Sequence, residues 1–320
     1  MKIVIPGGTG QVGTVLARDF HASGDEVVVL SRAPVTSPWR TVVWDGETPG
    51  PWRDELEGAD VLLNLAGRSV NCRYGDANRR AIMDSRVLST RVLGQALREA
   101  VDPPRVWLQA STATIYAHRS DAPNDEATGI LGGDEPGAPD TWNFSIDVAK
   151  SWEREANAAR TDRTRLVLLR SAMTMSPDRG GVFDVFLGLV RRGLGGATCG
   201  GRQYVSWVHD RDFARAVRFL IERDDLEGPV NIASPNPLPY REFMAALREA
   251  WGIRFGLPTT RWMLELGCFL MRTESELVLK SRRVVPGRLR EAGFAFEFER
   301  WPEAARDLVA RWRMENAPRR

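Results

Sequence analysis

Cysteine, histidine and lysine are all scarce in this 320-residue chain, with three of each. Cys72, Cys199 and Cys268 lie far apart and are odd in number, so we expect neither a disulfide framework nor a cysteine-ligated metal site. The histidines are equally scattered and form no zinc-binding pattern. We therefore expect isolated reduced thiols and no bound metal.

Long apolar runs and a marked charge excess are also missing. The most apolar stretch, residues 262–271, is short and contains Glu265, so no membrane span is expected. A formal net charge of +2 argues against nucleic acid or an anionic membrane as the main partner. The first residues already resemble a buried strand rather than a signal peptide, which predicts a cytoplasmic protein. A small-molecule substrate is the expected partner, for either a monomer or a homodimer.

Strands and helices are expected to alternate through the first half of the chain. Short apolar runs predict strands at 2–5, 26–30, 41–44, 61–65, 106–110 and 165–169, and helical spacing predicts helices at 79–100 and 146–160. Uninterrupted apolar strands are typical of sheets that are covered on both faces. The alternation therefore predicts an α/β fold with a doubly wound parallel (Rossmann) sheet.

The second half is less regular, and we place it in a smaller lobe. A glycine-rich segment at 180–201 surrounds an apolar helix, and short strands are expected at 205–208 and 230–232. Several helices should follow. We predict a dinucleotide-binding domain at 1–172 and a mostly helical substrate lobe at 173–320, with strands around 205–233 able to return to the first sheet.

A glycine turn follows the first apolar run and precedes an amphipathic helix. Three glycines, Gly7, Gly10 and Gly13, can serve the tight turn, the close approach of a pyrophosphate, and the packing of helix on strand. The helix N-terminus offers free N–H groups to phosphates. We expect the turn to bind a dinucleotide, together with the intervening residues Thr9, Gln11 and Val12; the alternative is a turn that binds nothing.

The end of the second expected strand distinguishes the two nicotinamide cofactors. An acidic residue there would bind the ribose 2′-hydroxyl of NAD, whereas an arginine accommodates the 2′-phosphate of NADP. This chain has Ser31 and Arg32 at that point, which favours NADP(H), although a surface arginine is common in so arginine-rich a protein. The residues after the fourth strand, Leu65, Ala66 and Gly67, include small ones that would let the cofactor cross the sheet edge.

These motifs resemble the atypical, epimerase-like branch of the extended short-chain dehydrogenase/reductase superfamily, over almost the whole chain. The matching blocks are residues 7–13, 31–32, 64–67, 85–91, 111–116, 152–153, 170–173, 192–196 and 203–212. The resemblance implies that Arg86 reaches the cofactor and that Met173 lies near the nicotinamide. Residues 284–286 and 293–296 resemble the small C-terminal domain of that branch, whose function is unassigned.

The superfamily's catalytic tyrosine is missing from its expected place. Its members use a Tyr, a Lys four residues later and a Ser or Thr, in which Lys lowers the pKa of Tyr and Tyr exchanges a proton with the substrate. Lys150 lies on the right helix, but Ile146 stands four residues before it, and an anchor on the neighbouring block places Ser145 there instead. Tyr116 is a substitute proton donor or, alternatively, structural.

Two further residues are candidates for the reaction. Thr112 falls where the superfamily's hydroxyl stands, as a substrate ligand or merely as a cap of the strand, and Lys150 binds the nicotinamide ribose or is a solvated surface lysine. We predict an NADP(H)-dependent oxidoreductase or epimerase-like enzyme that acts on a small polar carbonyl or carbinol substrate such as a sugar nucleotide. Its alternative is a non-catalytic NADP(H)-binding regulator or sensor.

Overall fold

A computed structural model describes residues 1–136, 138–270 and 274–316. In these ranges a seven-stranded parallel sheet has the order β10-β6-β5-β4-β1-β2-β3. The strands are β1 (Lys2–Pro6), β2 (Glu26–Ser31), β3 (Arg40–Val43), β4 (Val61–Asn64), β5 (Val106–Thr112), β6 (Arg165–Ser171) and β10 (Gly228–Ile232). This sheet confirms the predicted doubly wound parallel architecture.

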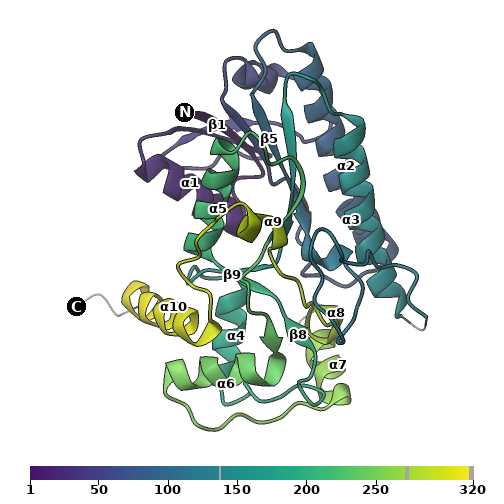
Figure 1. The fold of residues 1–320 in the computed structure, drawn as a ribbon, viewed down its shortest axis with the longest axis vertical. Helices are drawn as coiled ribbons and strands as arrows, with labels where there is room; N and C mark the ends of the chain where they lie inside the picture. The colour runs from purple at the N-terminus through teal and green to yellow at the C-terminus, as the bar shows by residue number, and fades with distance from the viewer. Residues whose placement is uncertain (137, 271–273, 317–320) are drawn as a thin grey trace.

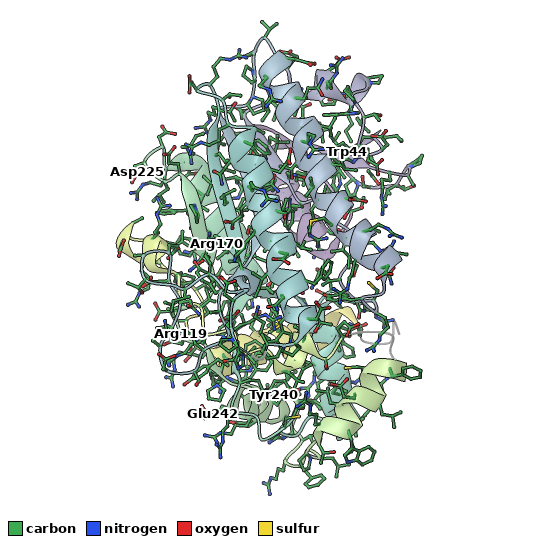
Figure 2. All side chains as sticks on the ribbon, turned by 90° about the vertical axis from the view of Figure 1, so that its right-hand side faces the viewer. Trp44, Arg119, Arg170, Asp225, Tyr240 and Glu242 are labelled. Atoms are coloured by element: carbon green, nitrogen blue, oxygen red, sulfur yellow. The ribbon has the colours of Figure 1, made fainter. Side chains whose placement is uncertain are left out.

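Successive strand residues point to opposite faces of the sheet. Because these strands are apolar at successive positions, both faces are apolar, and helices cover both. Ile3 and Ile5 face a core shared with α1 (Gln11–Ala22) and α5 (Asp210–Glu222), whereas Val4 faces a core shared with α2 (Asp76–Glu99). Helix α3 (Asp140–Ala158) packs beside α2. Figures 1 and 2 show the long pair α2 and α3 running side by side over their face of the sheet.

The strand order fixes where a ligand can enter. The order changes direction between β1 and β4, whose following connections lead to opposite sides of the sheet. Ligands in open α/β sheets bind beyond the carboxyl ends of the strands at such a point. The glycine turn after β1 and the residues after β4 both lie at this edge.

A second lobe continues the molecule beyond the carboxyl edge of the sheet (Figure 1). Its core joins α4 (Val182–Arg191), α6 (Tyr240–Trp251) and α10 (Trp301–Glu315). Two small two-stranded sheets pair β7 (Met173–Met175) with β9 (Trp207–His209) and β8 (Tyr204–Val205) with β11 (Leu238–Pro239). The remaining elements are η1 (Pro51–Leu56), η2 (Ala113–Ile115), α7 (Arg261–Leu270), α8 (Glu276–Leu279) and α9 (Gly287–Glu291).

The strand expected at 205–208 is wrong as a single element, because Ser206 separates β8 from β9. Its buried hydroxyl donates to the Arg282 carbonyl at 2.7 Å and accepts the Val284 N–H at 2.8 Å. Ser206 therefore fastens residues 282–284 across the junction of sheet and lobe. The third helix also begins earlier than expected, at Asp140.

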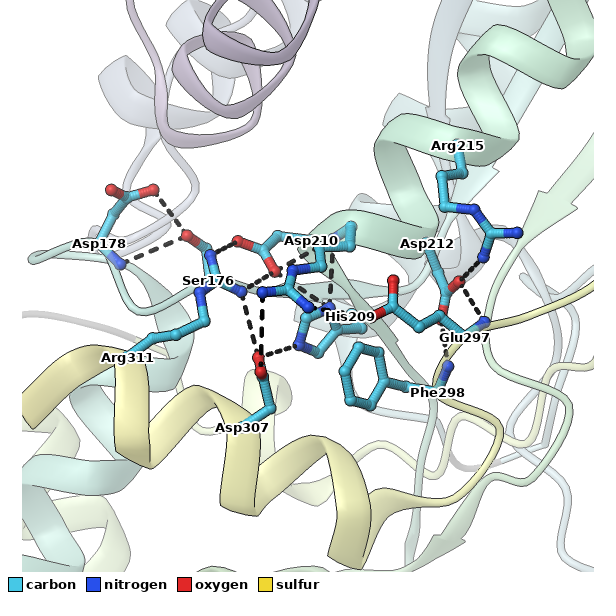
Figure 3. A network of polar contacts seen from close by, with 11 residues as sticks. Ser176, Asp178, His209, Asp210, Asp212, Arg215, Glu297, Phe298, Asp307 and Arg311 are labelled. Atoms are coloured by element: carbon cyan, nitrogen blue, oxygen red, sulfur yellow. Dashed lines mark hydrogen bonds and ion pairs between the residues drawn. The ribbon is translucent and has the colours of Figure 1, made fainter. Parts of the chain in front are cut away.

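A buried polar network joins α5 to α10 (Figure 3). Arg311 donates to both oxygens of Asp210 at 2.8 and 2.7 Å, and His209 Nε2 lies 3.0 Å from Asp307. The His209 ring stacks on Phe298, with 3.9 Å between centroids. Burial lowers the pKa of His209, so the neutral ring is the favoured form. These contacts give His209 a packing role between the two lobes.

None of the helices in the described ranges combines the length and the hydropathy that a bilayer crossing requires.

Candidate functional site

The glycine turn is shaped by close backbone approaches. Gly7 has a φ of 75°, and a Cβ on it would lie 2.7 Å from the Ala66 backbone. A Cβ on Gly13 would lie 2.5 Å from Gly8 Cα, whereas the nearest atom to one on Gly10 is 3.7 Å away. Gly7 and Gly13 thus allow the contacts of β1, α1 and β4, and Gly10 leaves open space at the tip of the turn.

The start of α1 presents free donors to that space. The first helical bond runs from the Thr14 N–H to the Gly10 carbonyl at 2.8 Å, so the N–H groups of residues 11–13 precede the helical ladder. Thr9 is exposed, while Val12 packs against the core below. Gln11 Nε2 is buried and has no hydrogen-bond partner among the residues described. This arrangement of backbone donors fits a pyrophosphate.

Ser31 and Arg32 lie at the carboxyl end of β2, on the same edge. Ser31 is buried, and its hydroxyl accepts the Ala33 N–H at 3.5 Å. Arg32 is exposed and forms no hydrogen bond or ion pair with any residue that the structure describes. Its guanidinium is therefore available to an anionic ligand that extends from the glycine turn toward β2.

The turn after β4 is held by a buried amide. Asn64 Oδ1 accepts the Ala66 N–H at 3.0 Å, and its Nδ2 donates to Gln109 at 2.9 Å. Leu65 donates its N–H to the Pro6 carbonyl at 2.9 Å, which keeps this turn against β1. A Cβ on Gly67 would lie 3.2 Å from Arg86 Cζ, so Gly67 leaves the room that this guanidinium occupies.

A cavity of about 260 Å³ opens between α2, α3 and the end of β5. Its size is close to the lower end of the range for small-molecule pockets, roughly 300 Å³. The wall combines aromatic, aliphatic, hydroxyl and charged side chains. It is formed by Val70, Tyr74, Ile82, Arg86, Ser111, Thr112, Thr114, Phe144, Ser145, Val148, Ala149, Trp152, Glu276 and Arg282.

Arg86 forms one cationic side of the cavity. Its guanidinium lies over the Trp152 ring, 5.0 Å from the centroid, and donates to the Ile82 carbonyl at 3.0 Å. Burial lowers the pKa of Arg86 to about 10, which leaves it charged at neutral pH. Arg86 thus lies between Gly67 and the cavity, and its contact with a cofactor stays a prediction.

Ser111 and Thr112, at the end of β5, both line the cavity. Thr112 Oγ1 accepts the Thr114 N–H at 3.2 Å, so it caps η2 and still has its own proton to donate. Ser111 donates to Glu153 at 2.6 Å, and Glu153 is held by a bidentate pair with Arg170, at 2.8 Å for each bond. The strand end is therefore rigid, and both interpretations of Thr112 are compatible with its contacts.

The residues of α3 that face the cavity do not include Lys150. Ser145 and Ala149, four residues apart, both line the cavity. Lys150 does not line it; its Nζ would lie 3.2 Å from a Cβ on Gly133, and Ile146 packs against the same loop. Of the two alignments considered above, the one that puts Ser145 at the tyrosine position is the one whose residues face the cavity, with Ala149 four residues later.

Tyr116 is 2% exposed and lies outside the cavity wall. Its hydroxyl donates to Asn231 at 3.0 Å and accepts from Arg170 at 3.0 Å. Burial raises the pKa of Tyr116. Figure 2 places Arg170 between the upper part of the molecule, where Trp44 lies, and the lower lobe with Tyr240. These contacts favour the structural interpretation of Tyr116.

Three further residues of the matching blocks are not part of the cavity wall. Met173 begins β7, and its N–H donates to the Ser206 carbonyl at 3.3 Å. Gln203 donates to the carbonyls of Thr198 and Val278, both at 3.3 Å, and Trp207 is fully buried against Trp301. Gln203 and Trp207, which belong to the matching block at 203–212, are packed in the lobe and do not line the cavity.

Sequence reasoning missed the residues that the C-terminal segment adds to the site. Glu276 and Arg282 line the cavity, and Lys280 lies behind it with its Nζ donating to the Thr114 carbonyl at 2.9 Å. Burial lowers the pKa of Lys280 to about 8 and also lowers that of Arg282. Because lysine is scarce in this chain, Lys280 stands out as much as Lys150 does, and that signal could have pointed to this segment.

Metal ligation finds no support in this region or elsewhere in the part of the chain that is described. No group of three His, Cys, Asp or Glu side chains there is arranged to hold an ion.

Comparisons with known proteins agree with the fold described above. An epimerase family protein of Staphylococcus epidermidis is 28% identical over 309 residues, which are 96% of this chain and 99% of that protein. The human epimerase family protein SDR39U1 is 28% identical over 313 residues, 97% of this chain and 100% of that protein.

Solved structures extend the likeness to three dimensions. A crystal structure of human SDR39U1 with NADPH has a TM-score of 0.84 at 26% identity, and the match covers 97% of this chain and 99% of that one. The UDP-N-acetylglucosamine 4-epimerase from Bacillus cereus shares the fold, with a TM-score of 0.73 at 18% identity over 98% and 99% of the two chains.

Family assignments cover most of the chain. Residues 259–308 match a domain of unknown function, DUF1731, which confirms the resemblance noted for the C-terminal segment. Residues 3–233 match the NAD dependent epimerase/dehydratase family, and because this match spans more than half of the chain, the protein belongs to that family.

Proposed function

We propose that the protein is an NADP(H)-dependent oxidoreductase or epimerase-like enzyme that acts on a carbonyl or carbinol carbon of a small polar substrate. The observation that carries this proposal is the position of the cavity, which lies at the same sheet edge as the glycine turn and Arg32. A dinucleotide that starts at Gly10 and crosses Gly67 would bring its nicotinamide toward Thr112. Sugar nucleotides are one substrate class to test.

The preference for NADP(H) rests on the end of β2. Arg32 can pair bidentately with a 2′-phosphate, and Ser31 can add a hydrogen bond. No acidic side chain stands at this strand end to bind a free 2′-hydroxyl. The NADPH in the structure of human SDR39U1 supports the same preference.

Each part of the cavity would contribute differently to catalysis. A bound NADPH would supply hydride. Thr112 would donate its hydroxyl proton in a hydrogen bond to the substrate oxygen and so orient the carbonyl. Arg86 would hold the cofactor beside Gly67, and the aromatic wall around Trp152 would exclude water from the reacting atoms. Met173 would border the nicotinamide from β7.

A sensor without turnover is the second candidate. The observation that favours it is the pair Ser145 and Ala149, which stand in the cavity where a Tyr and a Lys would act. In this case the protein would bind NADP(H) through Gly7, Gly10 and Gly13 and respond to its redox state without consuming it.

Binding and turnover test the two candidates in order. Calorimetric titration of the purified protein should show tighter binding of NADPH than of NADH; no heat and no thermal shift with either dinucleotide would overturn the proposal. The NADPH-loaded protein is then offered aldehydes, ketones and sugar nucleotides while the absorbance of NADPH is followed.

Thr112→Val separates enzyme from sensor, with Thr112→Ser as the matched control. We expect turnover to fall by about 10²-fold in the valine variant, since it loses an orienting hydrogen bond in a closed site, and to be largely kept in the serine variant. Tight NADPH binding with no consumption across the panel would favour the sensor.

A further inference from the structure

The cavity contains a carboxyl group from a segment remote in sequence. Glu276 in α8 is 2% exposed and lines the cavity together with Ser145 and Thr112. Its Oε2 accepts the Ser145 hydroxyl at 2.6 Å. Its Oε1 has no hydrogen-bond partner in the described ranges and lies 3.7 Å from Arg282 Nη2. One carboxyl oxygen is thus held by Ser145, and the other is buried beside Arg282 without a hydrogen bond of its own to any residue described.

The segment that carries Glu276 is fastened to the end of β5. Lys280 donates to the Thr114 carbonyl at 2.9 Å, and Arg282 Nε donates to Thr114 Oγ1 at 3.2 Å. Because Thr112 caps the same short helix η2, the Thr112 hydroxyl and the segment that carries Glu276 are both fixed to η2, and both residues line one cavity. Groups fixed in this way can act on the same substrate atom.

We propose that Glu276 is the proton donor and acceptor of this site, in the cavity position left without a tyrosine by Ser145. The inference rests on the proposed function, because it assigns a residue to the hydride-transfer reaction. It also gives the C-terminal domain of unknown function a role, which is to supply the acid–base group of the site.

The surroundings of Glu276 favour its protonated form more than water does. Burial is the largest influence and raises the pKa of Glu276; the carboxylate of Glu274 adds to this effect. Arg282, Lys280 and the serine hydrogen bond act in the opposite direction and do not cancel it. Tyr74, whose pKa is raised by burial to about 12, stays neutral beside it. A carboxyl group in such surroundings is suited to general acid–base catalysis.

The step balances with one hydride and one proton. In the direction of reduction, NADPH gives a hydride to the carbonyl carbon and is oxidised to NADP⁺. The π electron pair of the C=O bond moves to oxygen as the Glu276 O–H bond breaks and its proton forms the new O–H bond. The product is an alcohol, and the carboxylate of Glu276 is stabilised by Ser145 and Arg282 until it takes a proton from water. Oxidation is the reverse.

The first test observes Glu276 directly, by carbon NMR of the full-length protein labelled at the glutamate carboxyl carbons. Glu276→Gln assigns the signal, and Ser145→Ala provides a second assignment if that variant fails to fold. We expect the Glu276 carboxyl to titrate above the ordinary range, to titrate higher still in Ser145→Ala, and to shift when NADP⁺ is added. An ordinary titration and a signal unmoved by NADP⁺ would overturn the inference.

The second test compares variants. Glu276→Gln should bind NADPH within about threefold of wild type and lose about 10²- to 10⁴-fold in turnover, the usual contribution of a general acid. Glu126→Gln is the matched control: Glu126 also has a pKa raised by burial, but it binds the Asn231 N–H outside the cavity. If Glu276→Gln leaves turnover unchanged, the role of Glu276 is refuted and the proposed function is not affected. If the wild-type protein binds no NADPH, the proposed function itself is refuted.

Discussion

Replacement of Arg32 by alanine should reduce the affinity for NADPH and leave that for NADH almost unchanged. A hydrogen bond to a charged group contributes about 1.5–3 kcal/mol. Arg32 is exposed, so solvent screening reduces this to about 1–2 kcal/mol, or roughly 5- to 30-fold in Kd. NADH lacks the 2′-phosphate, and we expect its Kd to change by less than about twofold.

The assay for this prediction is calorimetric titration of both dinucleotides at two salt concentrations. Arg32→Lys keeps the charge without the bidentate geometry and should lie between wild type and alanine. Added salt should lower the preference of the wild type for NADPH and hardly affect the alanine variant. Arg306→Ala, an exposed arginine of α10, is the control. Equal losses for NADPH and NADH would refute the assignment of Arg32 to the 2′-phosphate.

Three further predictions concern the glycine turn, the hydrogen bonds between Ser206 and residues 282–284 (the Ser206 clasp), and the pH dependence of stability. Gly13→Ala should lower the free energy of unfolding, measured by urea denaturation, by about 1–3 kcal/mol because the added methyl group overpacks the turn. Gly10→Ala should fold normally and weaken NADPH binding. Equal stability of the two variants would contradict the packing argument. Ser206→Ala leaves the buried Val284 N–H unpaired and should cost about 1–3 kcal/mol by the same assay; an unchanged midpoint would argue against the clasp. The pKa of His209 is lowered in the folded state, so the unfolded chain binds the proton more readily and stability should fall as pH drops below about 6.5. His209→Asn should flatten this dependence, and an unaltered slope would exclude His209 as its source.

Local patterns in the sequence predicted much of the sheet and the turn. The glycine turn, with its flanking strand and helix, depends on residues within about fifteen positions of one another, so spacing alone identifies it. The strand predicted at 61–65 corresponds to β4 because a buried parallel strand is a continuous apolar run. The family resemblance followed from such local blocks and is confirmed by the match over residues 3–233.

The cavity wall was less predictable because it depends on contacts between distant segments. Glu276 meets Ser145 across 131 positions, and neither stands in a motif that announces the other. Lys150 drew attention by its rarity and its place on the correct helix, but a shift of one position along α3 decides which side chains face the cavity. That shift is set by the packing of α3 on α2, which only the three-dimensional structure shows.

The clasp formed by Ser206 bears on how this chain can be divided. The epimerase match ends at residue 233, yet Glu276 and Arg282 line the cavity beside Thr112, and Ser206 binds the carbonyl of Arg282. A gene shortened to the first match would encode the sheet and the glycine turn, and the cavity would lack the part of its wall that Glu276 and Arg282 form. The two regions are therefore expected to be inherited together, since an exchange of either one between relatives would separate the halves of one wall.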